Sequence, residues 1–301
     1  MISVIMLTYN RENLVARAIE SILRQTFLDF EFIIVDNGST DRSGAIADKY
    51  AAKDARIRVI HRERGSIAAG RNTGLDAAQG EYIAFIDDDD WVEPDWLVFL
   101  LKLLTEYDAD VSIAGAFDRA FDEKKHMSAE EAIIELMWRK KYNMAFPDKL
   151  FRQELFDELR FPEDTVYDDI ALMYRVLAEA KRGVVYHGLP KYTFFRHKSN
   201  NSAWTTHHKL LDAATLDEYL NAYRVRTEWL SKKFPASAAA FQYFEWSFMI
   251  SMVEKINRLK LMGCERQLAA MRKKLTEHRD EFLSCPEILA FEREWMERYI
   301  A

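Results

Sequence analysis

The sequence has few cysteines, no excess of positive charge and no long uninterrupted apolar segment. Cys264 and Cys285 are its only cysteines, and they suggest neither a disulfide framework nor a zinc site. The formal net charge is −7, and no broad cluster of Lys and Arg is present. Such a cluster drives binding to the nucleic-acid backbone. We therefore expect a protein of a reducing compartment that does not bind nucleic acid.

No stretch approaches the ~20 apolar residues that cross a bilayer, and the run "WLVFLLKLL" stops early and carries Lys102. The first ten residues read as a strand, without the basic region and cleavage site of a signal peptide. We therefore expect a cytoplasmic protein, either soluble or held at the inner face of the membrane. With 301 residues, 49% of them apolar, the chain can bury a sizeable core.

What the sequence does contain is a regular alternation of apolar runs and helical patterns. Strand-like runs fall at 2–7, 31–35, 57–61, 82–86 and 110–115, and helical patterns at 13–24, 43–52, 67–78 and 95–107. This alternation predicts an α/β fold in which a mostly parallel, Rossmann-like sheet is flanked by helices.

The alternation weakens after about residue 116. Ser128 and Glu131 form a capping-box pattern that predicts a helix to about Lys141. The segments 150–159, 168–180, 183–187 and 191–197 then predict a mixed region that closes one side of the sheet. We place one domain at 1–205 and a helical extension of three or four helices at 206–301. The extension's Met and aromatic residues favour packing on the main domain, with peripheral membrane contact or a homodimer as the alternative.

Polar residues follow three of the predicted strands. They are Thr8, Tyr9 and Asn10 after the first strand, Asp36 and Asn37 after the second, and Asp87, Asp88, Asp89 and Asp90 after the fourth. In a doubly wound sheet these strand ends share one edge, where ligands bind. Two charges about 4 Å apart repel by roughly 1 kcal/mol in water and about 4 kcal/mol at an effective dielectric of 20, so the aspartates need water or a cation.

These groups suit a nucleotide diphosphate. The ring of Tyr9 can stack on a base, Asp36 or Asn37 can accept a hydrogen bond from it, and the aspartates can hold Mg²⁺ or Mn²⁺ on the diphosphate. The alternatives are an ordinary turn at 36–41, a packing role for Tyr9 and a solvated aspartate loop. The stretch 65–72 has the glycine spacing of a phosphate loop, but Arg71 and Asn72 replace the required Lys and Ser or Thr.

Three segments, 3–43, 68–97 and 167–177, resemble family 2 glycosyltransferases of the GT-A fold, and the resemblance covers about the first two hundred residues. It implies an inverting transfer of a sugar from a nucleotide-diphosphate donor to a hydroxyl of a glycan or lipid-linked acceptor. It also implies a Mn²⁺ or Mg²⁺ cofactor and a place in cell-surface polysaccharide synthesis. Residues 1–115 would bind the donor, and residues 116–205 the acceptor.

The resemblance also implies residue roles. The first nucleotide-contacting segment of the family contains Thr8, Tyr9, Asn10 and Glu12. Two residues are implied to face the base, Asp36 and Asn37, while Arg71 approaches the donor and Asp88 lies near the ribose or phosphate. The D-x-D metal positions are occupied by Asp87 and Asp89, and Asp169 aligns with the catalytic base.

Two positions depart from the family pattern. Leu7 stands where many members have proline, and Asn37 replaces the second aspartate of the base-binding pair. The amide oxygen of Asn37 can still accept from uracil or thymine, which keeps UDP and dTDP donors open. In the segment 192–202, Arg196 or His197 could contact the diphosphate, with His197 also considered as a metal ligand. A surface turn explains that segment equally well.

Two other functions remain open. A catalytically idle nucleotide-sugar-binding or scaffold protein would keep the nucleotide site without transfer. A sugar nucleotidyltransferase would carry a glycine-rich loop with a basic residue after the first strand, and "TYNRENL" has neither.

Overall fold

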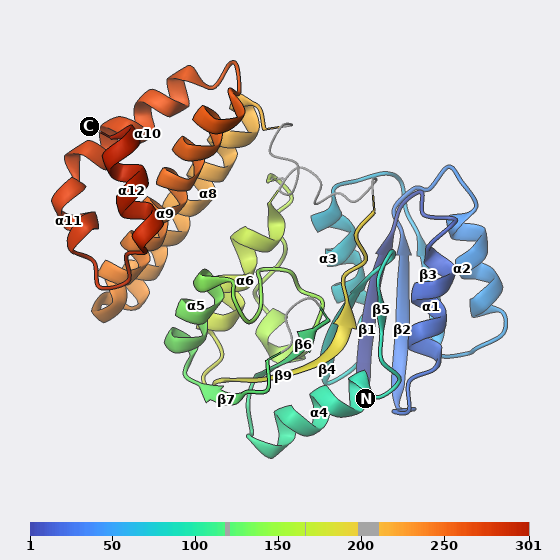
Figure 1. Cartoon of the computed structure of the whole chain (residues 1–301). Helices are drawn as coiled ribbons and strands as arrows, with labels where there is room; N and C mark the ends of the chain where they lie inside the picture. Colours follow the sequence, from blue (N-terminus) through green and yellow to red (C-terminus); the bar gives the residue numbers. More distant parts are fainter. Residues whose placement is uncertain (118–120, 166, 198–210, 301) are drawn as a thin grey trace. The chain divides into compact units, whose positions relative to one another are not determined.

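The structure is a computed structural model that describes residues 1–117, 121–165, 167–197 and 211–300. It comprises two compact units, Met1–Phe195 and Arg196–Ala301 (Figure 1). The predicted boundary at 205/206 lies outside the described residues. The division of the first domain into donor and acceptor halves stays a prediction.

The first unit is built on a nine-stranded sheet of order β3-β2-β1-β4-β8-β6-β9-β5, with β7 paired to β9. The strands are β1 (Ile2–Thr8), β2 (Phe30–Asp36), β3 (Ile57–His61), β4 (Tyr82–Asp87), β5 (Trp91–Val92), β6 (Val111–Ala116), β7 (Lys124–Met127), β8 (Lys149–Arg152) and β9 (Val184–Thr193). The helices are α1 (Val15–Leu23), α2 (Ser43–Ala51), α3 (Ile67–Ala77), α4 (Trp96–Glu106), α5 (Ala129–Trp138), the 3₁₀ turn η1 (Gln153–Phe156) and α6 (Asp168–Ala178).

The amino-terminal half of the sheet is parallel, as the sequence predicted. β1 pairs in parallel with β2 and β4, and β2 with β3. β1, β2 and β4 are apolar runs that are almost entirely buried, whereas only Ile57 is buried in β3, at the edge of the sheet. Helices lie on both faces of this half of the sheet (Figure 1). The expected α/β fold with flanking helices is thereby confirmed.

The other half of the sheet is mixed. β8 runs antiparallel to both β4 and β6, and β9 is parallel to β6 but antiparallel to β5 and β7. The short strands β5, β7 and β8 were not predicted individually, because runs of two to four residues carry no readable alternation. The two runs predicted at 183–187 and 191–197 form one strand, β9, whose register against β6 shifts near Gly115.

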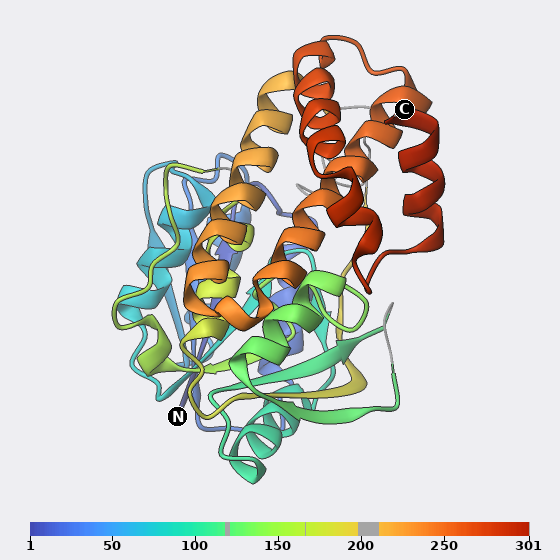
Figure 2. The same ribbon diagram turned by 90° about the vertical axis from the view of Figure 1, so that its left-hand side faces the viewer.

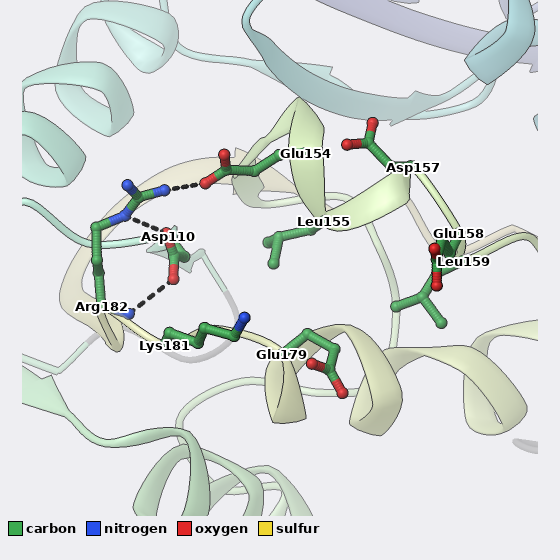
Figure 3. Close-up of a pocket in the computed structure, with 9 residues that line it drawn as sticks. All are labelled: Asp110, Glu154, Leu155, Asp157, Glu158, Leu159, Glu179, Lys181 and Arg182. Carbon is green, nitrogen blue, oxygen red and sulfur yellow. Dashed lines mark hydrogen bonds and ion pairs between the residues drawn. The ribbon is translucent and has the colours of Figure 1, made fainter.

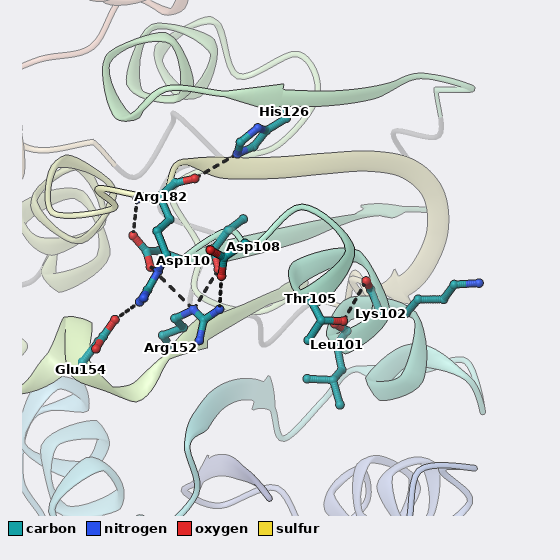
Figure 4. A network of polar contacts seen from close by, with 10 residues as sticks. Leu101, Lys102, Thr105, Asp108, Asp110, His126, Arg152, Glu154 and Arg182 are labelled. Carbon is teal, nitrogen blue, oxygen red and sulfur yellow. Dashed lines mark hydrogen bonds and ion pairs between the residues drawn. The ribbon is translucent and has the colours of Figure 1, made fainter.

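A buried ion cluster joins the amino-terminal ends of β6 and β9 to β8. The carboxylate of Asp110 accepts hydrogen bonds from the main-chain N–H and the Nε of Arg182, at 2.8 and 2.6 Å, and Arg152 Nε lies 3.7 Å from it (Figure 4). Arg182 also pairs with Glu154. Because Asp110 is nearly inaccessible, these two arginines supply the compensation that a buried carboxylate requires.

The second unit is helical, as predicted, but it contains more helices than expected. Within 211–300 the structure has α8 (Ala213–Lys233), the 3₁₀ turn η3 (Pro235–Ser237), α9 (Ala238–Leu259), α10 (Glu265–Glu277), α11 (Arg279–Ser284) and α12 (Ala290–Tyr299). Figure 2 shows the two longest helices, α8 and α9, running side by side. α8 ends just before Pro235, Gly263 lies between α9 and α10, and a further break follows Ser284, close to Pro286. No helix among the described residues is long and apolar enough to cross a membrane.

Candidate active site

The three polar strand ends meet at one edge of the sheet. Thr8, the last residue of β1, pairs with Asp36, the last residue of β2, and Leu7 pairs with Asp87, the last residue of β4. The parallel register therefore brings together segments that are up to 80 residues apart in the chain. The four consecutive aspartates leave β4 at this edge and enter four different environments.

Asp88 fastens the aspartate segment to the end of β1. Its Oδ2 accepts a hydrogen bond from the main-chain N–H of Tyr9 at 3.2 Å, and its Oδ1 lies 3.6 Å from Arg11 Nε. Burial, followed by the charge of Asp89, raises the pKa of Asp88 to about 7. These contacts give Asp88 a structural role in the loop that the sequence did not predict, beside its predicted place near the ribose or phosphate.

Asp90 fastens the same segment to β9. Its Oδ2 accepts from the hydroxyl of Tyr192 at 2.6 Å, and its Oδ1 accepts from the main-chain N–H of Phe195 at 2.7 Å. The Tyr192 hydroxyl also accepts from the main-chain N–H of Asp87 at 3.2 Å. Burial, together with the charge of Asp87, raises the pKa of Asp90. Asp90 is thus committed to holding the loop, which agrees with its absence from the predicted metal ligands.

Arg71, on α3, joins the aspartate loop to the start of α6. Its Nη1 donates to Asp168 Oδ2 at 2.9 Å, and its Nη2 lies 3.6 Å from Asp87 Oδ1. Burial raises the pKa of Asp87, the guanidinium of Arg71 opposes the shift, and Asp89 adds to it. The Asp87 side chain is nevertheless 43% exposed, so solvent reaches it in this structure. Asp168, in the first turn of α6, is the hydrogen-bonding partner of Arg71.

Asp169 lies beside this ion pair in the first turn of α6. Its Oδ1 accepts from the main-chain N–H of Ile170 at 2.8 Å. Burial raises the pKa of Asp169, Asp168 adds to the shift, and Arg71 opposes it. A carboxylate whose pKa is raised toward neutrality is better matched to accepting a proton than an ordinary aspartate.

The aspartate residues fit a divalent cation only if other oxygens complete its coordination. Among the residues that the structure describes, no group of three or more His, Cys, Asp or Glu side chains could hold a metal ion by itself. The carboxylates of Asp87 and Asp89 are hard oxygen donors, and burial, with the charge of Asp89 adding to it, raises the pKa of both Asp87 and Asp88. That donor set suits Mg²⁺ or Mn²⁺ bound through one or two carboxylates together with substrate phosphates.

The residues predicted to face a base have protein partners. Asp36 Oδ1 accepts from the main-chain N–H of Ser39 at 3.0 Å, and its Oδ2 lies 3.0 Å from His61 Nδ1. Asn37 is fully buried; its amide donates to the carbonyl of Gly65 at 2.9 Å and accepts from the Gly65 N–H at 3.2 Å. The Asn37 oxygen therefore already accepts one hydrogen bond, and its role toward a base stays a prediction.

The segment after β1 that was predicted to contact the nucleotide mainly holds the loop after β2 in place. The side-chain oxygen of Asn10, a residue with φ of 51°, accepts from the main-chain N–H of Thr40 at 2.8 Å. Glu12 Oε2 accepts from Arg42 Nε at 3.0 Å. Thr8 is buried at the end of β1. Arg196 is exposed and His197 partly buried; both belong to the second unit, so their predicted contacts remain predictions.

An arginine that the sequence did not single out covers the ring of Tyr9. The guanidinium carbon of Arg64 lies 3.4 Å from the centre of that ring. Gly38, with φ of +76°, lies close to the backbone of Arg64, and a Cβ at Gly38 would stand only 2.6 Å from the main-chain nitrogen of Arg64. The loops after β2 and β3 therefore place a cation where a base was expected to stack. No sequence pattern distinguishes Arg64 from its basic neighbour Arg62.

A cavity of about 600 Å³ lies elsewhere in the first unit (Figure 3). Its lining includes Asp110, at the amino-terminal end of β6, and residues of η1 and of the loop after α6. β6 runs in the same direction as β4, because both are antiparallel to β8. The cavity therefore lies toward the opposite edge of the sheet from the aspartate loop and is distinct from the candidate active site.

The fold defines the class of protein, an α/β protein of the GT-A type with an aspartate loop at the carboxyl edge of its sheet. The sequence model of "Glycosyl transferase family 2" matches residues 3–179, and the chain belongs to this family. Glycosyltransferase GlyA of Streptococcus pneumoniae is 30% identical over 261 residues, which are 75% of this chain and 37% of GlyA. The chain spans 50 to 64% of the length of three further curated relatives.

Solved structures show the same fold. Staphylococcus aureus TarS 1–349 in complex with UDP-GlcNAc has a TM-score of 0.63 at 20% identity, covering 99% of this chain and 91% of that one. The mannosyltransferase PcManGT of Pyrobaculum calidifontis, in complex with GDP-Man and Mn²⁺, has a TM-score of 0.60 at 17% identity, covering 99% and 84%.

Proposed function

We propose that the protein is an inverting, metal-dependent glycosyltransferase that moves a sugar from a nucleotide-diphosphate donor to a hydroxyl of a glycan or lipid-linked acceptor. The observation that carries this proposal is the bridge made by Arg71, which lies 3.6 Å from Asp87 and 2.9 Å from Asp168. It links Asp87, one of the two predicted metal ligands, to Asp168, which precedes the predicted base Asp169, although Asp87 and Asp168 are 81 positions apart in the chain (168 − 87). A scattered set of acids would not need a shared cation.

The chain's residues divide the reaction between them. Asp87 and Asp89 would hold Mn²⁺ or Mg²⁺, which supplies electrostatic stabilisation to the diphosphate leaving group when bound. Asp169 would take the proton of the acceptor hydroxyl during its attack on the anomeric carbon, because its raised pKa suits a general base. Arg71 orients Asp87 and Asp168 and limits the rise in the pKa of Asp169. A placed base typically contributes about 10² to 10⁴ in rate.

The donor is proposed to be a UDP-sugar, with dTDP as the second choice. The solved complex of TarS with UDP-GlcNAc supports a uridine donor. The complex of PcManGT with GDP-Man is the reason to include GDP among the nucleotides tested. We place the activity in polysaccharide synthesis at the cytoplasmic face of the membrane, a proposal that rests on the family alone. Contact of the second unit with a membrane or a second copy of the chain is likewise untested.

The proposal is tested by thermal unfolding of the wild type and Asp89→Asn with UDP, dTDP, GDP and CDP, each with and without Mn²⁺. A ligand at a hundred times its dissociation constant stabilises the folded state by about 2.7 kcal/mol. We expect one nucleotide to stabilise the wild type only with Mn²⁺, and Asp89→Asn to lose that shift. If no nucleotide shifts the wild type, the aspartates do not form a metal–diphosphate site and the proposal fails.

A companion variant, Asp169→Asn, separates transfer from binding. It should keep the metal-dependent stabilisation and lose transfer, because the amide cannot accept the acceptor's proton. Transfer at the wild-type rate would remove Asp169 as the base. Binding by the wild type without transfer or slow donor hydrolysis would favour the idle nucleotide-sugar-binding protein instead.

A further inference from the structure

Arg17, in the first turn of α1, is held between two aromatic rings. Its guanidinium carbon lies 4.0 Å from the centre of the Trp91 ring and 4.2 Å from that of Phe195. Trp91 belongs to β5, and Phe195 follows the end of β9. The two rings also contact one another, with centroids 5.6 Å apart. Three segments far apart in the chain therefore meet around one cation.

The cation acts on the aspartate loop through the main chain. Arg17 Nη2 donates a 2.6 Å hydrogen bond to the carbonyl oxygen of Asp89. Rings on the guanidinium restrict how that planar group can turn, so the direction of the donated bond is restricted as well. Fixing the Asp89 carbonyl fixes the peptide plane that follows its Cα. The direction in which the Asp89 side chain leaves the backbone is thereby constrained.

The rest of the loop is held by hydrogen bonds from main-chain N–H groups and by the side chain of Asp90. The Asp90 N–H donates to the Asp87 carbonyl at 3.2 Å, and the Asp87 N–H donates to the Tyr192 hydroxyl at 3.2 Å. Arg17 is the contact from α1 that reaches Asp89 itself. Phe195 takes part in holding both Asp89 and Asp90, since its main-chain N–H donates to the Asp90 carboxylate while its ring contacts Arg17.

We propose that Arg17 is a positioning residue that sets the orientation of Asp89 for metal binding, and that Trp91 and Phe195 act through it. This inference rests on the proposed function, because it concerns the metal site named there. It assigns a role to Arg17, which lies outside the aspartate segment and is not among the predicted donor or metal contacts. Arg17 touches neither metal nor donor in this role.

The positive charge of Arg17 and the planar shape of its guanidinium can be tested separately with two substitutions. Arg17→Lys keeps the positive charge near Asp89 but loses the planar group that the rings hold. Arg17→Met removes the charge as well and keeps an apolar side chain between the rings. If orientation is the function of Arg17, both variants weaken metal binding. If only charge matters, the lysine variant behaves like the wild type.

The experiment is isothermal calorimetry on the full chain. Mn²⁺ is titrated in the presence of the nucleotide that the thermal comparison identifies, and that nucleotide is then titrated at saturating Mn²⁺. We expect Arg17→Lys and Arg17→Met to raise the Mn²⁺ half-saturation concentration by about tenfold, which is the lower end of the loss typical when a residue that orients a metal ligand is removed. The nucleotide affinity at saturating Mn²⁺ should stay within about twofold, because saturating metal offsets the weaker Mn²⁺ binding by mass action.

A matched control is Arg56→Met. Arg56 also stacks on a ring, 4.4 Å from the centre of Phe30, and pairs with Asp54, but Phe30 begins β2 at the end remote from the aspartates. This variant should leave the Mn²⁺ half-saturation unchanged. A shift equal to that of Arg17→Met would show that general destabilisation explains both results, and it would overturn the proposal.

A double variant tests whether the rings act through Arg17. Phe195→Leu alone should raise the Mn²⁺ half-saturation, and adding it to Arg17→Met should produce no further loss. Independent, additive effects would overturn the assignment of Phe195, and wild-type metal affinity in both Arg17 variants would overturn that of Arg17. Absence of metal-dependent binding in the wild type is a different result, which overturns the proposed function and this role of Arg17 with it.

Discussion

At the scale of single residues, the aspartate loop separates side chains that hold structure from side chains oriented for a ligand. Asp90 bonds Tyr192 and the main chain of Phe195, whereas Asp87 lies near Arg71 and retains solvent exposure. The same residue type therefore has opposite consequences when it is replaced, and stability measurements can tell the positions apart.

We expect Asp90→Ala to lower the free energy of unfolding by about 1–3 kcal/mol, because it leaves the buried Tyr192 hydroxyl and the Phe195 N–H without an acceptor. Thermal or urea unfolding without ligand measures this. Asp164→Ala, at an exposed position, is the control and should have little effect. Equal stability of wild type and Asp90→Ala would mean that water replaces the carboxylate.

Arg64 offers a second prediction at this scale. If a base stacks on the ring face that Arg64 covers, its guanidinium has to leave, and the lost cation–π contact amounts to about 0.5–1 kcal/mol at an exposed site. Arg64→Ala should then bind nucleotide roughly two- to fivefold more tightly by calorimetry. Lys53→Ala, which removes an exposed charge away from Tyr9, should not. Weaker binding by Arg64→Ala would instead make Arg64 a contact of the ligand.

At the scale of elements, His61 links the ends of β2 and β3 to α2. Its Nδ1 lies 3.0 Å from Asp36 and its Nε2 lies 3.0 Å from Asp48, and the hydrogen bonds to Asp36 and then to Asp48 raise its pKa. Because the folded-state pKa exceeds the unfolded value of about 6.5, the contribution to stability is complete below that pH and disappears as pH rises through the folded pKa.

His61→Gln should therefore flatten the pH dependence of stability just above pH 6.5. Urea unfolding at several pH values between about 6 and 9 measures it against the wild type. His126→Gln, on β7, leaves the contacts of Asp36 and Asp48 intact and should preserve the wild-type profile. Identical profiles for His61→Gln and the wild type would show that solvent screens this half-exposed site. In that case His61 contributes by packing alone.

At the scale of the whole molecule, the first unit contains its own core and every predicted donor or metal residue except Arg196 and His197. We therefore predict that a fragment of residues 1–197 unfolds cooperatively and retains metal-dependent nucleotide binding. Circular dichroism melting and the thermal shift with Mn²⁺ would measure both properties. A fragment that folds but does not bind would show that the site needs residues beyond 197, and a fragment that fails to fold would remove the independence of the first unit.

The sequence determined the alternating elements of the first 115 residues, the helical character of the second unit and the strand ends that carry polar side chains. Each of these follows from local periodicity and from the rule that parallel strands end at one edge. The short strands β5, β7 and β8 carry too few residues for such periodicity, and their places in the sheet follow from long-range pairing alone.

Only the tertiary structure decided which acids work together. Asp87, Asp88, Asp89 and Asp90 are neighbours in sequence, but their roles depend on Arg71, Tyr9, Arg17 and Tyr192, which come from four other segments. A carboxylate's function is set by the charges and donors within a few ångströms of it, and sequence distance does not encode those neighbours. Folding brings them together, and so the structure, not the motif, assigns each aspartate its environment.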